Sequence, residues 1–255
     1  MTEHLRLEKK GHIASLVIDR PDRRNAFSHD MWAVLPNLVE AAMTDDAIRL
    51  LILRGADGRA FSAGADISEF GAKAHDLDWG KRNQAAIRNS QYALARAAKP
   101  TIAFVEGVCV GGGCGLAIAC DLRVSGPKAR FGITPARLGI VYSLHDTKLL
   151  VDLVGPSQAK RILFTAKLMD APEAHRIGLV DFLSDDPDAA LAELSAAILA
   201  ASPASVAGTK RNIDRILAGQ VDDDEATLAE FRAAFRSPDY QEGVAAFIEK
   251  RSADF

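Results

Sequence analysis

Short apolar runs alternate with longer mixed stretches through the first two thirds of the chain. Residues 13–18, 49–54 and 101–105 each hold five or six mostly aliphatic residues bounded by polar ones. Runs of this length and composition are typical of buried β-strands. Stretches with helical periodicity separate them, so the order predicts an α/β chain in which strands and helices wind in sequence.

The first of these helical stretches has an identifiable start. Ser28 is a suitable N-cap, and the apolar positions that follow it recur at helical spacing: Leu35, Leu38, Val39 and Ala42. Pro36 falls inside this span and predicts a kink or a later start of the helix.

From Ala189 onward the composition changes to helix-forming residues. Four helical stretches are expected, at residues 189–201, 205–218, 222–235 and 240–250, with Pro203, Gly219 and Ser237-Pro238 between them. We therefore predict a core over residues 1–188 and a helical C-terminal region over residues 189–255.

Composition and charge describe an ordinary globular protein. Of the 255 residues, 48% are hydrophobic and 25% are charged. A net charge of −3 argues against a nucleic-acid or membrane-surface partner. Its three cysteines lie together at Cys109, Cys114 and Cys120 without a nearby histidine, which favours reduced core thiols in a cytoplasmic protein and no bound metal.

A glycine-rich stretch over residues 99–121 carries the strongest sign of chemistry. Gly111 to Gly113 follow the strand at 101–105 and precede a small-residue helix at 116–120. The unpaired N–H groups of a helix start can hold negative charge. A nucleotide-phosphate loop is excluded because Cys114 and Leu116 stand where its defining residues belong. An oxyanion that develops on a carbonyl, or a tight turn that serves packing alone, both fit the glycines.

A second small-residue bend follows another strand, at residues 59–67 (RAFSAGADI). With the glycine stretch, Asp121 and Phe131-Gly132, it resembles the enoyl-CoA hydratase/isomerase (crotonase) superfamily. The likeness continues in four further segments: Ile18 to Pro21 with Asn25-Ala26, Lys99-Pro100, residues 174–180 (AHRIGLV), and Glu242-Gly243 with residues 247–251 (FIEKR). These ordered motifs cover nearly the whole chain.

The resemblance implies a fold and an activity. The fold would be a spiral of ββα repeats with a helical C-terminal region for oligomerisation, as a homotrimer or a dimer of trimers. The substrate would be an acyl-CoA thioester, with coenzyme A as part of the substrate and no permanently bound cofactor. Carried over by motif, the backbone N–H groups of Ala65 and Gly112 would stabilise an oxyanion on the thioester carbonyl.

Coenzyme A would bind along the first bend. The resemblance implies backbone contacts at Ala63, Gly64, Asp66 and Ile67, cations at Arg24 and Lys210 for its phosphates, and Phe247 with Lys250 from the terminal helix.

The acid–base residues of the family are missing. Hydratases place one glutamate where this chain has Gly115 and a second where it has Pro135. Three interpretations remain open. Asp146, with or without His145, replaces the glutamates in a single-base reaction such as isomerisation. Alternatively, the oxyanion site alone decarboxylates a malonyl-type thioester whose carboxylate Tyr142 or His145 orients, or the protein binds acyl-CoA without turnover.

Overall fold

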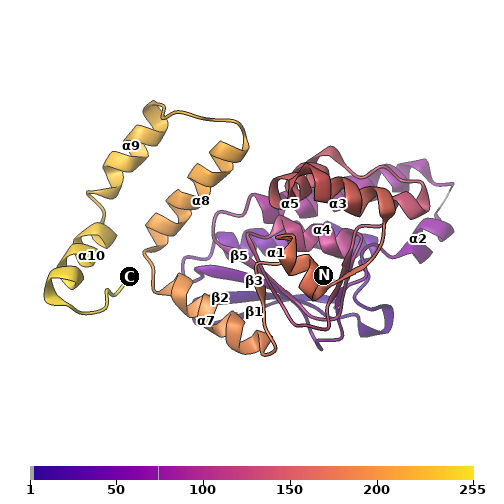
Figure 1. Ribbon diagram of the computed structural model, residues 1–255, viewed down its shortest axis with the longest axis horizontal. Coiled ribbons are helices and arrows are strands. Elements are labelled where there is room, and N and C mark those ends of the chain that lie inside the picture. The colour runs from indigo at the N-terminus through magenta and orange to yellow at the C-terminus, as the bar shows by residue number, and fades with distance from the viewer. Residues whose placement is uncertain (1–2, 74) are drawn as a thin grey trace.

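The computed structural model describes residues 3–73 and 75–255, and the elements repeat in the order strand, strand, helix (Figure 1). The strands are β1 (Leu5–Lys10), β2 (Ile13–Ile18), β3 (Leu50–Gly55), β4 (Ala60–Ser62), β5 (Thr101–Val105), β6 (Val108–Val110), β7 (Leu122–Ser125), β8 (Arg130–Gly132), β9 (Met169–Asp170) and β10 (Phe182–Leu183). The helices are α1 (His29–Met43), α2 (Ile67–Ala72), α3 (Leu77–Ala95), α4 (Gly112–Ala119), α5 (Leu144–Thr165), α6 (Ala171–Arg176), α7 (Pro187–Leu199), α8 (Pro203–Leu217), α9 (Glu225–Ala234) and α10 (Pro238–Glu249), with 3₁₀ turns η1 (Pro21–Arg23) and η2 (Pro135–Leu138).

Two sheets divide the strand pairs between them. The larger sheet has the order β1-β2-β3-β5-β7-β10, and the smaller has the order β4-β6-β8-β9. From β3 to β8, the first strand of each pair joins the larger sheet and the second joins the smaller one. Each pair then leads into a helix and on to the next layer, which confirms the expected α/β spiral of ββα repeats.

Both faces of the larger sheet are buried, as is usual for parallel strands. Along β3, Leu51 and Leu53 face the main core while Leu50 and Ile52 face a smaller cluster that includes Leu191 of α7. Figure 1 shows α3, α4 and α5 on one side of this sheet and α7 on the other. Side-chain alternation along single strands therefore fixes which helices cover which face.

The helical C-terminal region confirms the expected elements but not their starts. Pro187, Pro203 and Pro238 each occupy the first turn of a helix, directly after a capping Asp or Ser. Proline suits this position because the first N–H groups of a helix have no intrahelical partner. The sequence predicts that Pro203 and Pro238 separate helices, whereas in the structure they begin them.

The helices α8, α9 and α10 form an arm that extends from the body (Figure 1). Within it, Arg211 and Arg215 of α8 both pair with Glu230 of α9. No single described helix is long and apolar enough to cross a membrane; α7 and α8 pass that test only as a pair bent by 102°.

In the first helix, Ser28 caps the N-terminus as predicted, with its hydroxyl oxygen accepting from the Met31 N–H. Pro36 lies inside α1. The prediction that Pro36 delays the start of the helix is wrong, because Ser28 caps the N-terminus and α1 begins at His29.

A glycine contact between α4 and β4 generates the first testable prediction. A methyl group at Gly113 would lie 2.5 Å from the Ser62 carbonyl oxygen, so Gly113→Ala should lower the free energy of unfolding by about 1–3 kcal/mol. Gly71 of α2 has open space around the same position. Gly71→Ala is the matched control and should raise stability by about 0.5–1 kcal/mol, as alanine does in helices. Chemical denaturation checks both, and equal effects would contradict this packing.

Candidate active site

The bend at residues 62–66 leaves one backbone donor unused. Among the described residues, the Ala65 N–H has no hydrogen-bond acceptor. The N–H groups around it are all paired: Ala63 donates to the Arg24 carbonyl (2.9 Å), Gly64 to the Ser62 hydroxyl (3.1 Å) and Asp66 to the Phe27 carbonyl (2.8 Å). Ala65 itself is partly exposed.

Buried polar side chains hold this bend in place. Asn25 adopts a left-handed backbone conformation (φ 56°) and donates from its side chain to the Ala60 carbonyl. Asp66 accepts from the Arg20 guanidinium at 2.8 Å and from the Ser68 hydroxyl at 2.6 Å. Burial by itself raises the pKa of Asp66, but the hydrogen bonds from Ser68 and Arg20 outweigh it and hold the pKa below its ordinary 3.8.

The glycine bend leaves a second donor unused. Gly111 adopts φ 58° and donates to the Gly132 carbonyl, while Gly115 donates back to the Gly111 carbonyl. Between them, the Gly112 N–H has no acceptor in the part of the chain that the structure describes. Gly112 is the first residue of α4, where the helix dipole is positive.

The two bends touch at their glycines. A Cβ atom on Gly64 would lie 2.9 Å from the Gly112 nitrogen, and one on Gly112 would lie 3.7 Å from the Ala65 nitrogen. The Trp32 ring approaches the same Gly112 position to 3.1 Å and forms a wall beside it. Two unpaired N–H groups thus lie at one junction, an arrangement that can stabilise negative charge on an oxygen atom.

Gly115 has no side chain, and the side chains of Gln91 and Tyr142 fill the space beside it. A Cβ atom there would lie 2.7 Å from the Gln91 amide nitrogen and 3.0 Å from the Tyr142 hydroxyl. Gln91 is 1% exposed. The sequence analysis missed it, although its spacing from Ile87 and Leu94 places it on the apolar face of α3, where a glutamine is unusual.

Asp146 lies on the far side of the Gln91 amide. Its Oδ2 accepts from Gln91 Nε2 at 3.1 Å, its Oδ1 lies 3.1 Å from His145 Nδ1, and the residue is 6% exposed. Ser143, and not Asp146, caps α5: the Ser143 hydroxyl oxygen accepts from the Asp146 N–H at 3.1 Å.

Burial, followed by the nearby Asp146 charge, raises the pKa of Tyr142 well above its ordinary value, so the phenol stays neutral.

The residues expected to bind coenzyme A are only partly brought together. Arg24 adjoins the first bend and is exposed, and Ile67 is half exposed beside it. Lys210 is occupied, because its ammonium pairs with Asp121 at 2.7 Å and donates to the Lys99 carbonyl at 3.1 Å. Phe247 and Lys250 lie at the end of α10, and Figure 1 places α10 at the opposite end of the molecule from α2.

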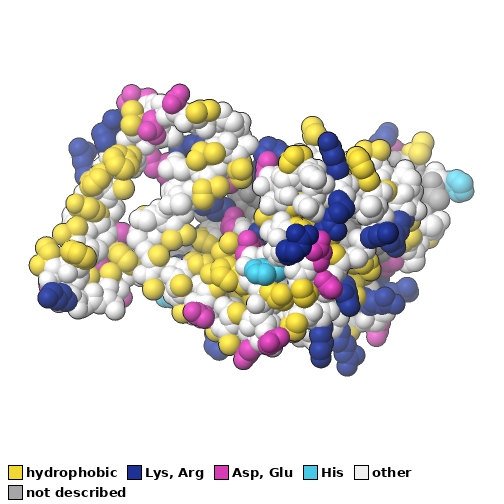
Figure 2. Space-filling view, viewed as in Figure 1, with side chains coloured by type: hydrophobic (Ala, Val, Ile, Leu, Met, Phe, Trp, Pro, Cys, Tyr) yellow, Lys and Arg dark blue, Asp and Glu magenta, His cyan; other side chains and the backbone are white. Residues whose placement is uncertain are grey.

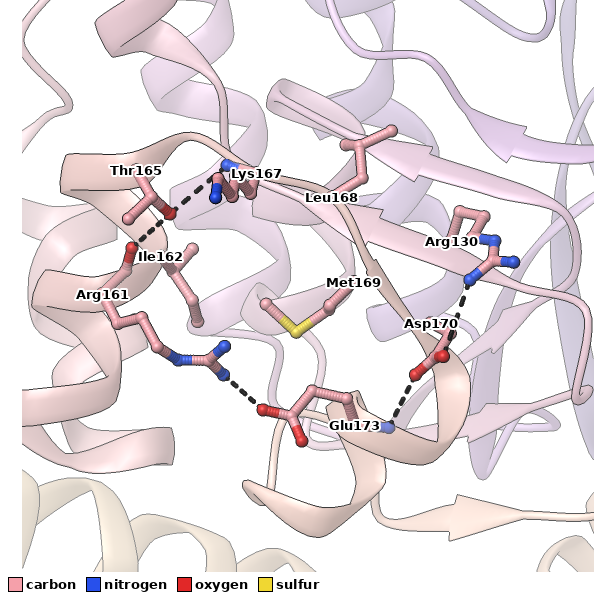
Figure 3. Close-up of a pocket in the computed structure, with 9 residues that line it drawn as sticks. All are labelled: Arg130, Arg161, Ile162, Thr165, Lys167, Leu168, Met169, Asp170 and Glu173. Atoms are coloured by element: carbon pink, nitrogen blue, oxygen red, sulfur yellow. Dashed lines mark hydrogen bonds and ion pairs between the residues drawn. The ribbon is translucent and has the colours of Figure 1, made fainter.

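A cavity of about 510 Å³ opens elsewhere, at the edge of the smaller sheet (Figure 3). Its charged side chains pair across it: Arg161 lies 2.7 Å from Glu173, and Arg130 lies 3.8 Å from Asp170. Lys167 also lines the cavity and forms no ion pair with another described residue. No group of three or more His, Cys, Asp or Glu side chains within the described residues is placed to hold a metal ion.

The lowered pKa of Asp66 predicts a pH-dependent contribution to stability. A carboxylate whose pKa is depressed by folding stabilises the fold above its unfolded pKa, about 4, and loses that contribution as the pH falls through the folded value. Asp66→Asn should lower the free energy of unfolding by about 1.5–3 kcal/mol at pH 7. The difference in unfolding free energy between variant and parent should shrink below pH 4. Asp22→Asn, at an exposed site, is the control; a pH-independent cost at Asp66 would argue against the ion pair. Urea denaturation at several pH values measures both.

Comparison with known proteins identifies the family of this chain. A sequence profile of the family described as Enoyl-CoA hydratase/isomerase matches residues 8–255. The crotonyl-CoA hydratase of Syntrophomonas wolfei is 35% identical, over 99% of this chain and 98% of that protein. The mitochondrial Delta(3,5)-Delta(2,4)-dienoyl-CoA isomerase of Dictyostelium discoideum is 32% identical, over 99% of this chain and 91% of that protein.

Solved structures agree as well. The crystal structure of an enoyl-CoA hydratase/carnithine racemase from Magnetospirillum magneticum superposes with a TM-score of 0.94 at 33% identity, covering 100% of this chain and 96% of that one. The chain therefore belongs to the enoyl-CoA hydratase/isomerase family.

Proposed function

We propose that this protein is an acyl-CoA enzyme that stabilises a thioester enolate at Ala65 and Gly112 and moves a proton with one carboxylate, Asp146. Isomerisation of an enoyl-CoA is the reaction that best matches two backbone donors and a single carboxylate. The observation that carries the proposal is the position of Asp146, which is buried one hydrogen bond away from the amide that fills the space beside Gly115.

The two backbone donors support the enolate half of the proposal. Removal of an α-proton moves charge onto the thioester oxygen, and donors fixed beforehand stabilise that charge with little reorganisation. One such donor lowers a barrier by about 3–4 kcal/mol in other oxyanion holes. The hydrogen-bonded bend around Ala65 and the helix start at Gly112 provide that rigidity.

Hydration requires more acid–base groups than the described site contains. Addition of water requires one group to deprotonate the water and another to handle the α-carbon proton. Gly115 and Pro135 carry no proton, and Pro135 begins the 3₁₀ turn η2. Transfer of a proton between the α and γ carbons needs one base that acts twice, which Asp146 can provide.

Tyr142 favours decarboxylation of a malonyl-type thioester as a second candidate. Its hydroxyl is buried without a hydrogen-bond partner among the described residues, and the phenol is neutral. A neutral donor in that place suits a substrate carboxylate. Release of carbon dioxide from a malonyl thioester would separate this reaction from isomerisation.

Asp146→Asn tests the proposed base. Exchange of substrate α-protons with deuterated water, followed by mass spectrometry across a panel of enoyl thioesters, should slow by at least about 100-fold, because general-base catalysis contributes that much or more. Acyl-CoA binding, measured by the shift in melting temperature, should persist. Asp152→Asn on the same helix is the control and should exchange normally. Unchanged exchange in Asp146→Asn would contradict the proposal, and binding without any exchange in the parent would favour a non-catalytic acyl-CoA protein.

We also propose that copies of this chain cover the arm, as a homotrimer or a dimer of trimers. Large apolar side chains remain exposed on α8, α9 and α10, and Figure 2 shows hydrophobic atoms along this arm. Phe247 is 86% exposed and Ile248 is 73% exposed. Contiguous exposed apolar surface is characteristic of an interface between proteins. Coenzyme A would enter as part of the substrate, with no permanently bound cofactor, and we expect the assembly to be cytoplasmic.

Light scattering after gel filtration tests this assembly. The parent should have a mass of three or six times 27.3 kDa. Phe247→Asp with Ile248→Asp should shift it toward smaller species, because burial of two charges in an apolar interface is unfavourable. Leu77→Asp is a control at an apolar side chain 77% exposed elsewhere. A monomeric parent would contradict the proposal.

A further inference from the structure

We infer that Gln91 is a positioning residue that takes over the room of the missing side chain at Gly115 and directs the Asp146 carboxylate toward the substrate. This inference rests on the proposed role of Asp146 as the base. It adds a residue on α3 to a site otherwise built from the two bends and the start of α5.

The evidence is a set of short contacts around one point. The position that a Cβ of Gly115 would occupy lies 2.7 Å from Gln91 Nε2 and 2.9 Å from its Oε1. The same Nε2 donates to Asp146 Oδ2 at 3.1 Å. The amide is therefore wedged between α4 and the carboxylate, and no side chain larger than that of glycine fits at 115 without displacing it.

The amide constrains the carboxylate more than a simple packing contact would. Gln91 engages one oxygen of Asp146 and His145 engages the other, which fixes the plane of the group. His145 is held in turn, with its ring edge-on to Tyr92 at 4.2 Å between centroids. Each carboxylate oxygen keeps a further lone pair, which is what proton abstraction requires.

The amide also has an unused end. Gln91 Oε1 and the Tyr142 hydroxyl are both buried without a hydrogen bond of regular geometry among the described residues, although Gln91 is close enough to the phenol to act on its pKa. An unsatisfied buried polar atom is destabilising, so each one calls for a local explanation. Here they border the proposed reaction centre and the carboxylate.

Two substitutions separate a positioning role from a packing role. Gln91→Met keeps the length of the side chain and removes the donor. Gln91→Glu keeps the shape and places a second carboxylate beside Asp146, so that the pair would share a proton. Other ionisable groups near Asp146 include His145, at 3.1 Å, and the neutral Tyr142, on which Cys114 and Cys109 also act.

Carboxyl-carbon NMR of the full chain labelled at aspartate measures this coupling without a substrate. The Asp146 signal is assigned from its loss in Asp146→Asn. Its chemical shift should change in both Gln91→Met and Gln91→Glu, because the hydrogen bond that the amide donates is lost in each. Gln84→Met, at an exposed site on α3, should leave it unchanged. An Asp146 signal at the same position in all four proteins would overturn the inference.

The rate of α-proton exchange at saturating substrate provides the functional readout. It should fall in both Gln91 variants, while acyl-CoA binding, measured by the shift in melting temperature, persists. Exchange that depends on Asp146 but is unchanged in the Gln91 variants would overturn only the positioning role. A Gln91 effect on the NMR signal in a parent that exchanges no protons would instead overturn the proposed function.

Discussion

The site depends on the close approach of two glycine-containing bends. Gly64 and Gly112 approach so closely that a Cβ on Gly64 would meet the Gly112 nitrogen at 2.9 Å. Each bend belongs to a different ββα repeat, so the spiral and its parallel strand pairing bring them together. Any larger side chain at Gly64 would separate the bends and cover the Gly112 N–H.

The hydrogen bonds of the first bend explain why one donor stays free. Asn25, Arg20 and Ser62 satisfy the neighbouring polar groups, so the backbone at Ala65 does not have to turn inward to find a partner. Free backbone donors are ordinarily costly, but Ala65 and Gly112 are both partly exposed and can be solvated. The fold thus keeps two fixed donors open to solvent at little cost.

Local patterns predicted the strands at residues 13–18, 49–54 and 101–105, the Ser28 cap and the glycine bends, because these depend on residues close in sequence. The starts of the C-terminal helices were misplaced because proline was interpreted as a break at Pro203 and Pro238, whereas both lie in the first turn. Lys210 was predicted to contact phosphate, but in the structure it pairs with Asp121, 89 residues away in sequence. Gln91 escaped notice for the same reason: its importance arises from Gly115 and Asp146, which are remote in the chain. Side-chain pairings of this kind are set by tertiary packing, which periodicity and motif spacing do not encode.

The most direct measurement is a crystal structure of the protein with an acyl-CoA thioester or a stable thioester analogue bound. The account predicts that the carbonyl oxygen accepts from both Ala65 N and Gly112 N at about 2.7–3.1 Å, with the α-carbon facing Asp146. A carbonyl oxygen that contacts neither nitrogen, or a ligand bound away from the junction of the two bends, would contradict it.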